Sequence, residues 1–134
     1  MIAIFGIITI GSAQENETVK IKEVITAFSK AGDAQDYKSL DNYLDDNYRV
    51  VMNRLFGSKE MSVMPKSIYL DKIKSKEFGG DQRSLSFKNI SVNGSTASAE
   101  VSFVGSKLTF HSIILLAKDE KNTWKLISDV PMVQ

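Results

Sequence analysis

His111 is the only histidine in this sequence of 134 residues, and it is the side chain best suited to acid–base chemistry near neutral pH. A neutral imidazole can orient a ligand or act as a general base. A lone histidine more often points to the other face of its strand, or bonds to a neighbouring hydroxyl or backbone group. No second metal ligand lies at a suitable spacing and cysteine is absent, so we expect no metal site, no cofactor and no thiol chemistry.

Three carboxylates, Asp45, Asp46 and Asp129, are the other candidates for a base. The first two open a turn-prone Asp-Asp-Asn segment, and Asp129 lies near the end of the last apolar run. Aspartate commonly caps turns through local hydrogen bonds. We therefore favour a capping role for these carboxylates over a catalytic one.

Aromatic and apolar side chains predict a ligand pocket, because small-ligand sites are mostly apolar with a few polar groups. Arg49 and Arg54 differ by an odd number, so only one of them can face such a pocket from a strand, and with Arg83 it can clamp an anionic ligand. Solvated arginines and a filled core are the alternatives. The predicted ligand-binding residues are Tyr43, Tyr48, Met52, Arg54, Phe56, Tyr69, Phe110 and His111.

The first half of the chain has helical periodicity. Apolar residues at 21, 24, 25 and 28 predict a helix from Thr18 to Gly32, and Asp33 is placed to cap a second, short helix that ends at 45–47. Pro65 can begin a third helix, which the glycine pair at 79–80 stops. A hairpin with strands at 48–56 and 59–64 lies between the second and third helices.

The second half alternates with a period of two, which predicts a strand meander. A change of parity near Asn89 indicates a bulge, and Asn93-Gly94 predicts a tight turn. The strand at 107–118 is apolar on both faces at its centre, so we expect it mid-sheet and covered on both sides. A last strand, at 124–130, ends before Pro131. The whole pattern is α+β.

Residues 1–10 are almost entirely apolar, and the small residues Gly11, Ser12 and Ala13 follow them. This resembles an export signal over residues 1–14 ahead of a single domain at 15–134, although no basic residue precedes the apolar run. A first strand over residues 2–10 is the alternative. We expect export to the bacterial periplasm or the extracellular space. The run is too short to span a bilayer, so we expect no membrane partner after signal removal.

The charge pattern bears on partners. The formal net charge is +1, and basic and acidic residues are interspersed along the chain. Nucleic-acid-binding domains usually have a concentrated basic surface. We therefore expect no nucleic-acid partner.

Three groups of residues carry a resemblance to a known family. They are Ala31-Gly32-Asp33, the segment 90–97, and the apolar strand at 112–118 with the Trp-Lys-Leu-Ile segment at 124–127. In order and spacing, over residues 18–130, they resemble the nuclear transport factor 2 superfamily, and most of all its bacterial lumazine-binding proteins. The resemblance implies a cone-shaped, cystatin-like α+β fold, with three N-terminal helices packed on a strongly curved, mostly antiparallel sheet. Ser112 stands where many lumazine-binding-like members have aspartate.

The same resemblance implies a limited set of functions, since the superfamily includes isomerases, cyclases, dehydratases and plain binders. Mapped from the corner after the first helix, the catalytic positions of the related ketosteroid isomerases fall on Ile25, on Met52 or Asn53, and near Leu115. None of these residues has a side chain that could act as the catalytic acid, base or tyrosine of those enzymes. We therefore expect a non-enzymatic exported domain that binds a small, mostly apolar molecule or a protein partner in its cone.

Two other functions stay open at this point. One is an isomerase, cyclase or dehydratase that uses His111 as its general base. The other is a structural dimerisation module with a filled cone. A homodimer through the exposed sheet face is expected from the apolar outer positions of the central strand and from the resemblance.

Overall fold

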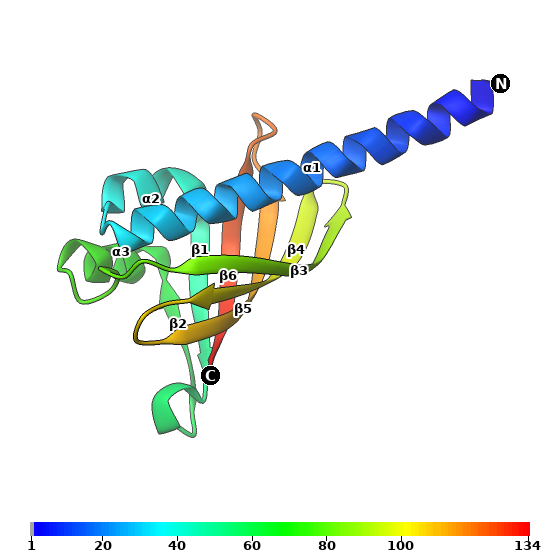
Figure 1. The fold of residues 1–134 in the computed structure, drawn as a ribbon. Helices are drawn as coiled ribbons and strands as arrows, with labels where there is room; N and C mark the ends of the chain where they lie inside the picture. Colours follow the sequence, from blue (N-terminus) through cyan, green and yellow to red (C-terminus); the bar gives the residue numbers. More distant parts are fainter. Residues whose placement is uncertain (1) are drawn as a thin grey trace.

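Residues 2–134 form three helices and six strands in the computed structural model, which describes side chains from residue 13 onward (Figure 1). The helices are α1 (Ile2–Asp33), α2 (Tyr37–Tyr43) and α3 (Lys66–Lys74). A short 3-10 turn, η1 (Leu55–Gly57), separates the first two strands. The strands are β1 (Leu44–Asn53), β2 (Met61–Pro65), β3 (Ser84–Asn93), β4 (Thr96–Val104), β5 (Thr109–Lys118) and β6 (Trp124–Val133).

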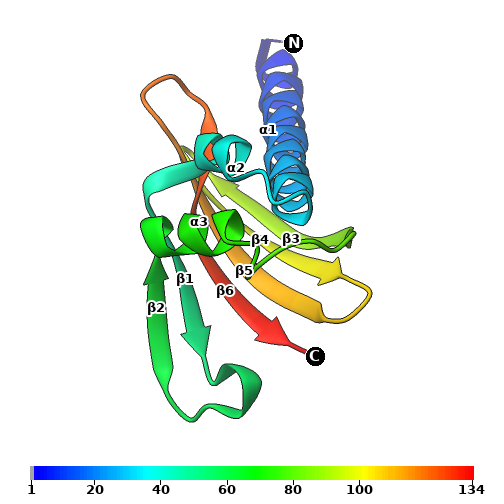
Figure 2. The same ribbon diagram turned by 90° about the vertical axis from the view of Figure 1, so that its left-hand side faces the viewer.

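The six strands form one sheet in the order β2-β1-β6-β5-β4-β3. Neighbouring strands are antiparallel except β1 and β6, which are parallel. Figure 2 shows the three helices on one side of a curved sheet. This arrangement confirms the predicted α+β fold of three helices on a curved, mostly antiparallel sheet.

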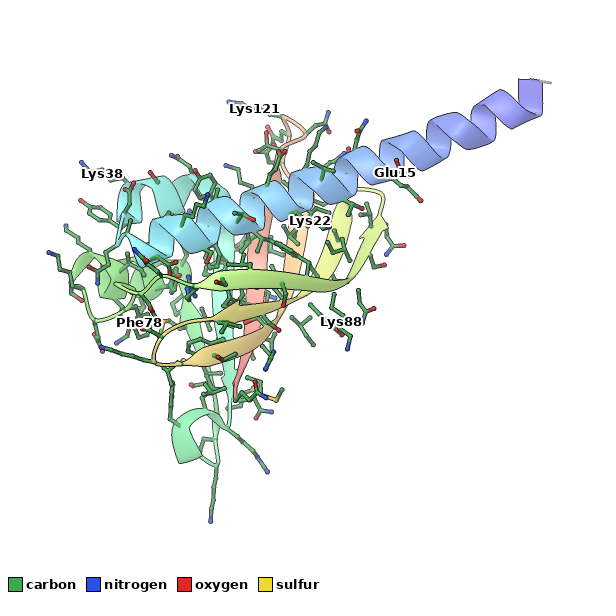
Figure 3. The ribbon with its side chains drawn as sticks, in the orientation of Figure 1. Glu15, Lys22, Lys38, Phe78, Lys88 and Lys121 are labelled. Carbon is green, nitrogen blue, oxygen red and sulfur yellow. The ribbon has the colours of Figure 1, made fainter. Side chains whose placement is uncertain are left out.

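The first helix is longer than predicted. α1 runs without interruption from Ile2, through the predicted start at Thr18, to Asp33. A first strand over residues 2–10 is therefore wrong, whereas an export role for residues 1–14 stays a prediction. The N-terminal part of α1 projects past the sheet (Figure 1), and Glu15 lies on this projecting part (Figure 3). Among the helices of residues 2–134, none is both long and apolar enough to cross a membrane.

The corner between α1 and α2 is built differently from the prediction. The residue that takes the left-handed conformation is Gln35, with φ 57°, and not a glycine. Asp36 caps α2 by accepting a hydrogen bond from the backbone N–H of Ser39 at 3.2 Å. Asp33, the predicted cap, accepts hydrogen bonds from Arg83 instead, because the loop before β3 lies against the end of α1.

The hairpin and the third helix begin and end at other residues than predicted. β1 begins at Leu44, ahead of the predicted start at Tyr48, because α2 leads directly into it. β2 begins at Met61. α3 ends at Lys74, before the predicted glycine stop, and Lys76, with φ 65°, already leaves the helical conformation.

The meander from β3 to β6 follows the prediction except at its end. The bulge near Asn89 is confirmed by a φ of 53° and by a register shift between β3 and β4. Gly94, with φ 60°, lies in the predicted tight turn. The last strand continues through Pro131 to Val133. The proline is tolerated because β1 pairs with β6 only as far as Asp129, so that β6 has a free side beyond this point.

β5 lies in the middle of the sheet, as predicted, but the helices cover only one of its faces. Ile114 on the covered face is fully buried, whereas Ile113 on the other face keeps 49% of its surface exposed. The expectation of cover on both sides is thus wrong for this chain alone. We call the uncovered side the outer sheet face; its exposed apolar residues include Met61, Val63, Ile113 and Met132.

Candidate functional site

A cavity of about 520 Å³ lies between the helices and the sheet, and we call it the cone cavity. Residues of α1 and α3 line one side of it, and residues of β1, β4, β5 and β6 line the other. Aromatic and apolar side chains dominate, among them Phe28, Tyr69 and Phe103. Phe78, which is labelled in Figure 3, contributes to the lining from the loop after α3. The volume is that of a site for a small organic molecule.

The structure brings four of the predicted ligand-binding residues together in the lining: Met52, Phe56, Tyr69 and Phe110. Tyr48 lies behind the lining, with 1% of its surface exposed, and its ring packs against that of Tyr69 with centroids 5.4 Å apart. The alternation of β1 explains why both Tyr48 and Met52 point toward the helices, because Tyr48, Val50 and Met52 share the inner face of the strand.

Tyr43 and Arg54 lie away from the cone cavity. Tyr43 lines a separate surface groove beside α1, together with Lys20 and Trp124. Arg54 is exposed beyond the end of β1 with φ 56°, so the strand alternation used for the prediction no longer applies to it. Arg49 is also exposed, and the predicted pairing of one of these arginines with Arg83 around an anion does not form.

His111 lies on the outer sheet face, which corrects the prediction that it faces a ligand. Phe110 and Ser112, its neighbours on β5, point into the cone cavity, so His111 points away from it. Its Nδ1 lies 2.7 Å from Ser102 Oγ, and its Nε2 lies 2.7 Å from Gln134 Oε1. Both ring nitrogens are occupied outside the cavity, and the imidazole cannot reach a bound molecule.

Asp129 is the carboxylate that the sheet contributes to the lining of the cone cavity. It lies on β6 opposite Val50 and Ile114, both inward-facing, and its Oδ1 is buried with no hydrogen-bond partner among the described residues. Burial raises the pKa of Asp129 to about 6, against the opposing effects of a hydrogen bond from Ser112 and the charge of Arg83. The predicted capping role is wrong for Asp129 and right for Asp45, which accepts the backbone N–H of Asn47 at 2.9 Å.

Two tyrosine hydroxyls accompany this carboxyl group. Burial raises the pKa of both Tyr48 and Tyr69, and the neighbouring Asp129 contributes to each shift. Both hydroxyls therefore keep their protons at neutral pH. The hydroxyl of Tyr48 is buried and has no partner among the described residues. We call these three groups, Tyr48, Tyr69 and Asp129, the polar floor of the cone cavity.

Arg83 also lines the cone cavity, but other groups already use its charge. Its Nε donates to Asp33 Oδ1 at 2.6 Å and its backbone N–H donates to Asp33 Oδ2 at 2.9 Å. A terminal nitrogen donates to the carbonyl of Ser29 at 3.3 Å, and the guanidinium lies 5.0 Å from the centre of the Phe103 ring. Arg83 therefore joins the start of β3 to α1 and has little free charge for an anion.

No group of three histidine, aspartate or glutamate side chains within residues 13–134 is arranged to hold a metal ion.

Asp129 is one of the three carboxylates that the sequence offers as a base, but its place near the end of an apolar run favours a capping role there. The available signal was its place between Ile127 and Val130, because an acid inside an apolar strand is costly unless it has a role.

No protein-family model matches the sequence, and no curated protein matches it. Solved structures are similar in fold. One is an NTF2-like protein of unknown function from Silicibacter pomeroyi, with a TM-score of 0.77 and 12% identity over 90% of this chain and 98% of that one. Another, from Erwinia carotovora atroseptica, is described as ketosteroid isomerase-like. It has a TM-score of 0.68 and 13% identity over 86% of this chain and 94% of that one. A protein of unknown function with a cystatin-like fold, from Nostoc punctiforme, has a TM-score of 0.71 and 14% identity over 87% and 90%.

These likenesses define the class of structure: the chain has the nuclear transport factor 2-like, cystatin-like fold. The predicted superfamily resemblance is confirmed at the level of the fold. The narrower resemblance to lumazine-binding proteins stays a prediction. At identities of 12 to 14%, the likeness assigns no ligand and no activity to this chain.

Proposed function

We propose that this domain binds a small, mostly apolar molecule in the cone cavity and does not transform it. The observation that carries the proposal is a cavity of about 520 Å³ whose lining is mostly aromatic and aliphatic, with a buried carboxyl group at its polar floor. Small-molecule sites have this composition. A dimerisation module with a filled cone would not leave such a space, and a concave site favours a small molecule over a protein partner.

Native mass spectrometry of the protein purified without denaturation tests this proposal. We expect an additional mass that disappears in Met52→Trp, because the larger side chain fills the cavity from its inner lining. Val51→Trp is the matched control, since Val51 is the next residue of β1 and faces the outer sheet face. An additional mass that both variants retain would place the ligand elsewhere and contradict the proposal.

An acid–base enzyme is a second candidate, with Asp129 in the role first considered for His111. The pKa of Asp129, raised to about 6, is close to the value that suits proton transfer at neutral pH. Androst-5-ene-3,17-dione, a ketosteroid with an isomerisable double bond, is a direct probe. We expect no turnover; turnover by the wild type that Asp129→Asn abolishes would overturn the binding proposal in favour of the enzyme.

We further propose that the protein is exported and that two copies associate through the outer sheet face. Support for export comes from the attachment of α1, whose first side-chain hydrogen bonds to the sheet among residues 13–134 are made by Glu17, beyond the predicted signal. N-terminal sequencing of protein recovered from the periplasm or medium tests export. A mature chain that still begins at Met1 would contradict it.

A further inference from the structure

The charge of Asp129 has no counterion within the cone cavity. Its Oδ1 is buried and unpartnered among the described residues, and an ionised carboxylate in such a place is costly unless it is paired. The groups that face it are the hydroxyls of Tyr48 from β1, Tyr69 from α3 and Ser112 from β5. All three are uncharged, so none of them neutralises the carboxylate.

Arg83 is the cation near Asp129, and it belongs to another ion pair. Its side chain and backbone both donate to Asp33, whose carboxylate cancels the guanidinium charge. The Arg83–Asp33 pair therefore contributes no net charge to the cavity. One buried negative charge remains at the polar floor whenever Asp129 is ionised.

The rim of the cone cavity leaves this negative charge uncompensated, because its own charges balance. Glu77 and Asp81 line it with one lysine, Lys107. Glu77 is paired with Lys72 at 3.0 Å, whereas the carboxylate of Asp81 is held by hydrogen bonds from Ser106. A cavity whose one uncompensated charge is the carboxylate of Asp129 repels anions and attracts cations.

The aromatic lining is suited to the same kind of ligand. Phe28, Tyr69, Phe103 and Phe110 line the space next to the polar floor. The faces of aromatic rings attract cations, most strongly where water is excluded. Apolar contact and charge pairing are therefore available to a single molecule.

We infer that the cone cavity selects an apolar molecule that carries one protonated nitrogen, such as an aromatic ring with an alkylamine group, and that this nitrogen donates a hydrogen bond to Asp129. This inference rests on the proposed binding function and names the chemical class of its ligand. The ammonium group supplies the missing counterion, and its N–H groups satisfy Oδ1 of Asp129.

Three probes of matched shape test the inference: 1-naphthylmethylamine, 1-naphthylmethanol and 1-naphthylacetate, each measured by isothermal titration calorimetry. At pH 7.5 we expect the amine to bind at least about tenfold more tightly than the alcohol, a difference typical of one charge-assisted hydrogen bond. The acetate should bind more weakly than both. Asp129→Asn should remove the preference for the amine, and Asp71→Asn, an exposed substitution on α3, should leave it unchanged.

Lowering the pH supplies a second readout on the unaltered protein. Because the pKa of Asp129 is about 6, the amine should lose about tenfold in affinity between pH 7.5 and pH 5, while the alcohol changes little. Equal or tighter binding of the alcohol or the acetate, or an amine preference that Asp129→Asn retains, overturns the inference and leaves the binding function standing. Failure of all three probes to bind overturns both.

Discussion

Asp129 makes the stability of this fold depend on pH. Its pKa is about 6 in the folded chain and its ordinary value is 3.8, so between these pH values the folded chain keeps a proton that the unfolded chain has lost. The contribution of Asp129 to stability is therefore full below about pH 4 and decreases as the pH rises to about 6. We expect Asp129→Asn to raise the free energy of unfolding at pH 7.5 by about 2 to 3 kcal/mol and to change it little at pH 4.

Urea denaturation of both proteins at pH 4 and pH 7.5 measures this difference. Asp36, Asp81 and Asp119 have pKa values lowered by local hydrogen bonds, so they act in the opposite direction and destabilise the fold in acid. They titrate in both proteins, and their effect cancels in the comparison. A stabilisation of equal size at both pH values would contradict a role for the ionisation of Asp129.

The contrast between His111 and Asp129 shows what residue type alone can predict. A histidine stands out in a sequence because its ordinary pKa is near neutral, yet His111 faces away from the cavity. Asp129 acquires a similar pKa only through burial, and burial depends on which face of β6 it occupies. A register shift between β5 and β6 changes the parity along the strand, so that face could not be counted from the sequence.

At the scale of elements, Gly79 determines how closely the loop after α3 approaches α1. Its φ is 85°, and a Cβ at this position would lie 2.2 Å from the carbonyl oxygen of Gly32. We expect Gly79→Ala to cost about 3 kcal/mol or more, since it adds a backbone clash to the cost of a positive φ. Gly57→Ala is the control, because Gly57 has φ 79° and open space around it, and should cost about 1 kcal/mol. If thermal unfolding shows equal losses of stability in the two variants, the close approach of Gly79 to Gly32 does not contribute to the stability of the fold.

Glu17 attaches α1 to the far end of the sheet. It accepts hydrogen bonds from Lys118 Nζ at 3.0 Å and from the indole N–H of Trp124, and these bonds lower its pKa. We expect Glu17→Gln to cost about 1 kcal/mol at pH 7, as is typical for partly exposed charged contacts. The cost should decrease as the pH falls below the ordinary value of 4.5, where the carboxylate becomes protonated.

Chemical denaturation at pH 7 and pH 3 checks the role of Glu17, with Glu15→Gln as control. Glu15 is exposed on the projecting part of α1 and should have no effect (Figure 3). If both substitutions cost the same, the bonds to β5 and β6 do not hold the helix.

The elements themselves were largely predictable, and their limits were not. The period of the apolar residues depends only on local backbone geometry, so it predicted the helices after Thr18 and every strand of the meander. The limits at Asp33 and Pro131 depend on partners distant in the sequence. Arg83 takes the side chain expected to cap α2, and the early end of the β1 ladder admits a proline within β6.

For the whole molecule, the outer sheet face is the surface on which the proposed dimer depends. Ile113 lies at its centre and is 49% exposed. We expect Ile113→Glu to convert a dimer into a monomer, because a charge at the centre of an apolar contact loses its hydration without a partner. Light scattering after size-exclusion chromatography measures the mass. Lys121→Glu, on the exposed turn between β5 and β6, should leave it unchanged; a monomeric wild type would contradict the dimer.

The cone shape of the cavity was expected from the family resemblance, and part of its lining from the aromatic and apolar side chains. Met52, Tyr69 and Phe110 were predicted to share a pocket, but their apolar character also fits a filled core. Whether a space remains depends on the curvature of the sheet and on the distance of α3 from it. Neither the curvature nor the distance can be predicted from the pattern of residues in the sequence.

The parallel pairing of β1 with β6 has a consequence for when the protein can fold during its synthesis. β6 comes last among the strands in sequence order, yet it lies between β1 and β5 and holds Asp129 at the polar floor. The hairpin of β1 and β2 therefore stays detached from the meander until the final strand leaves the ribosome. Contacts between such distant segments form slowly. Under the proposed export, the chain must stay unfolded until it reaches a translocation channel, and this strand order delays folding until β6 has been made.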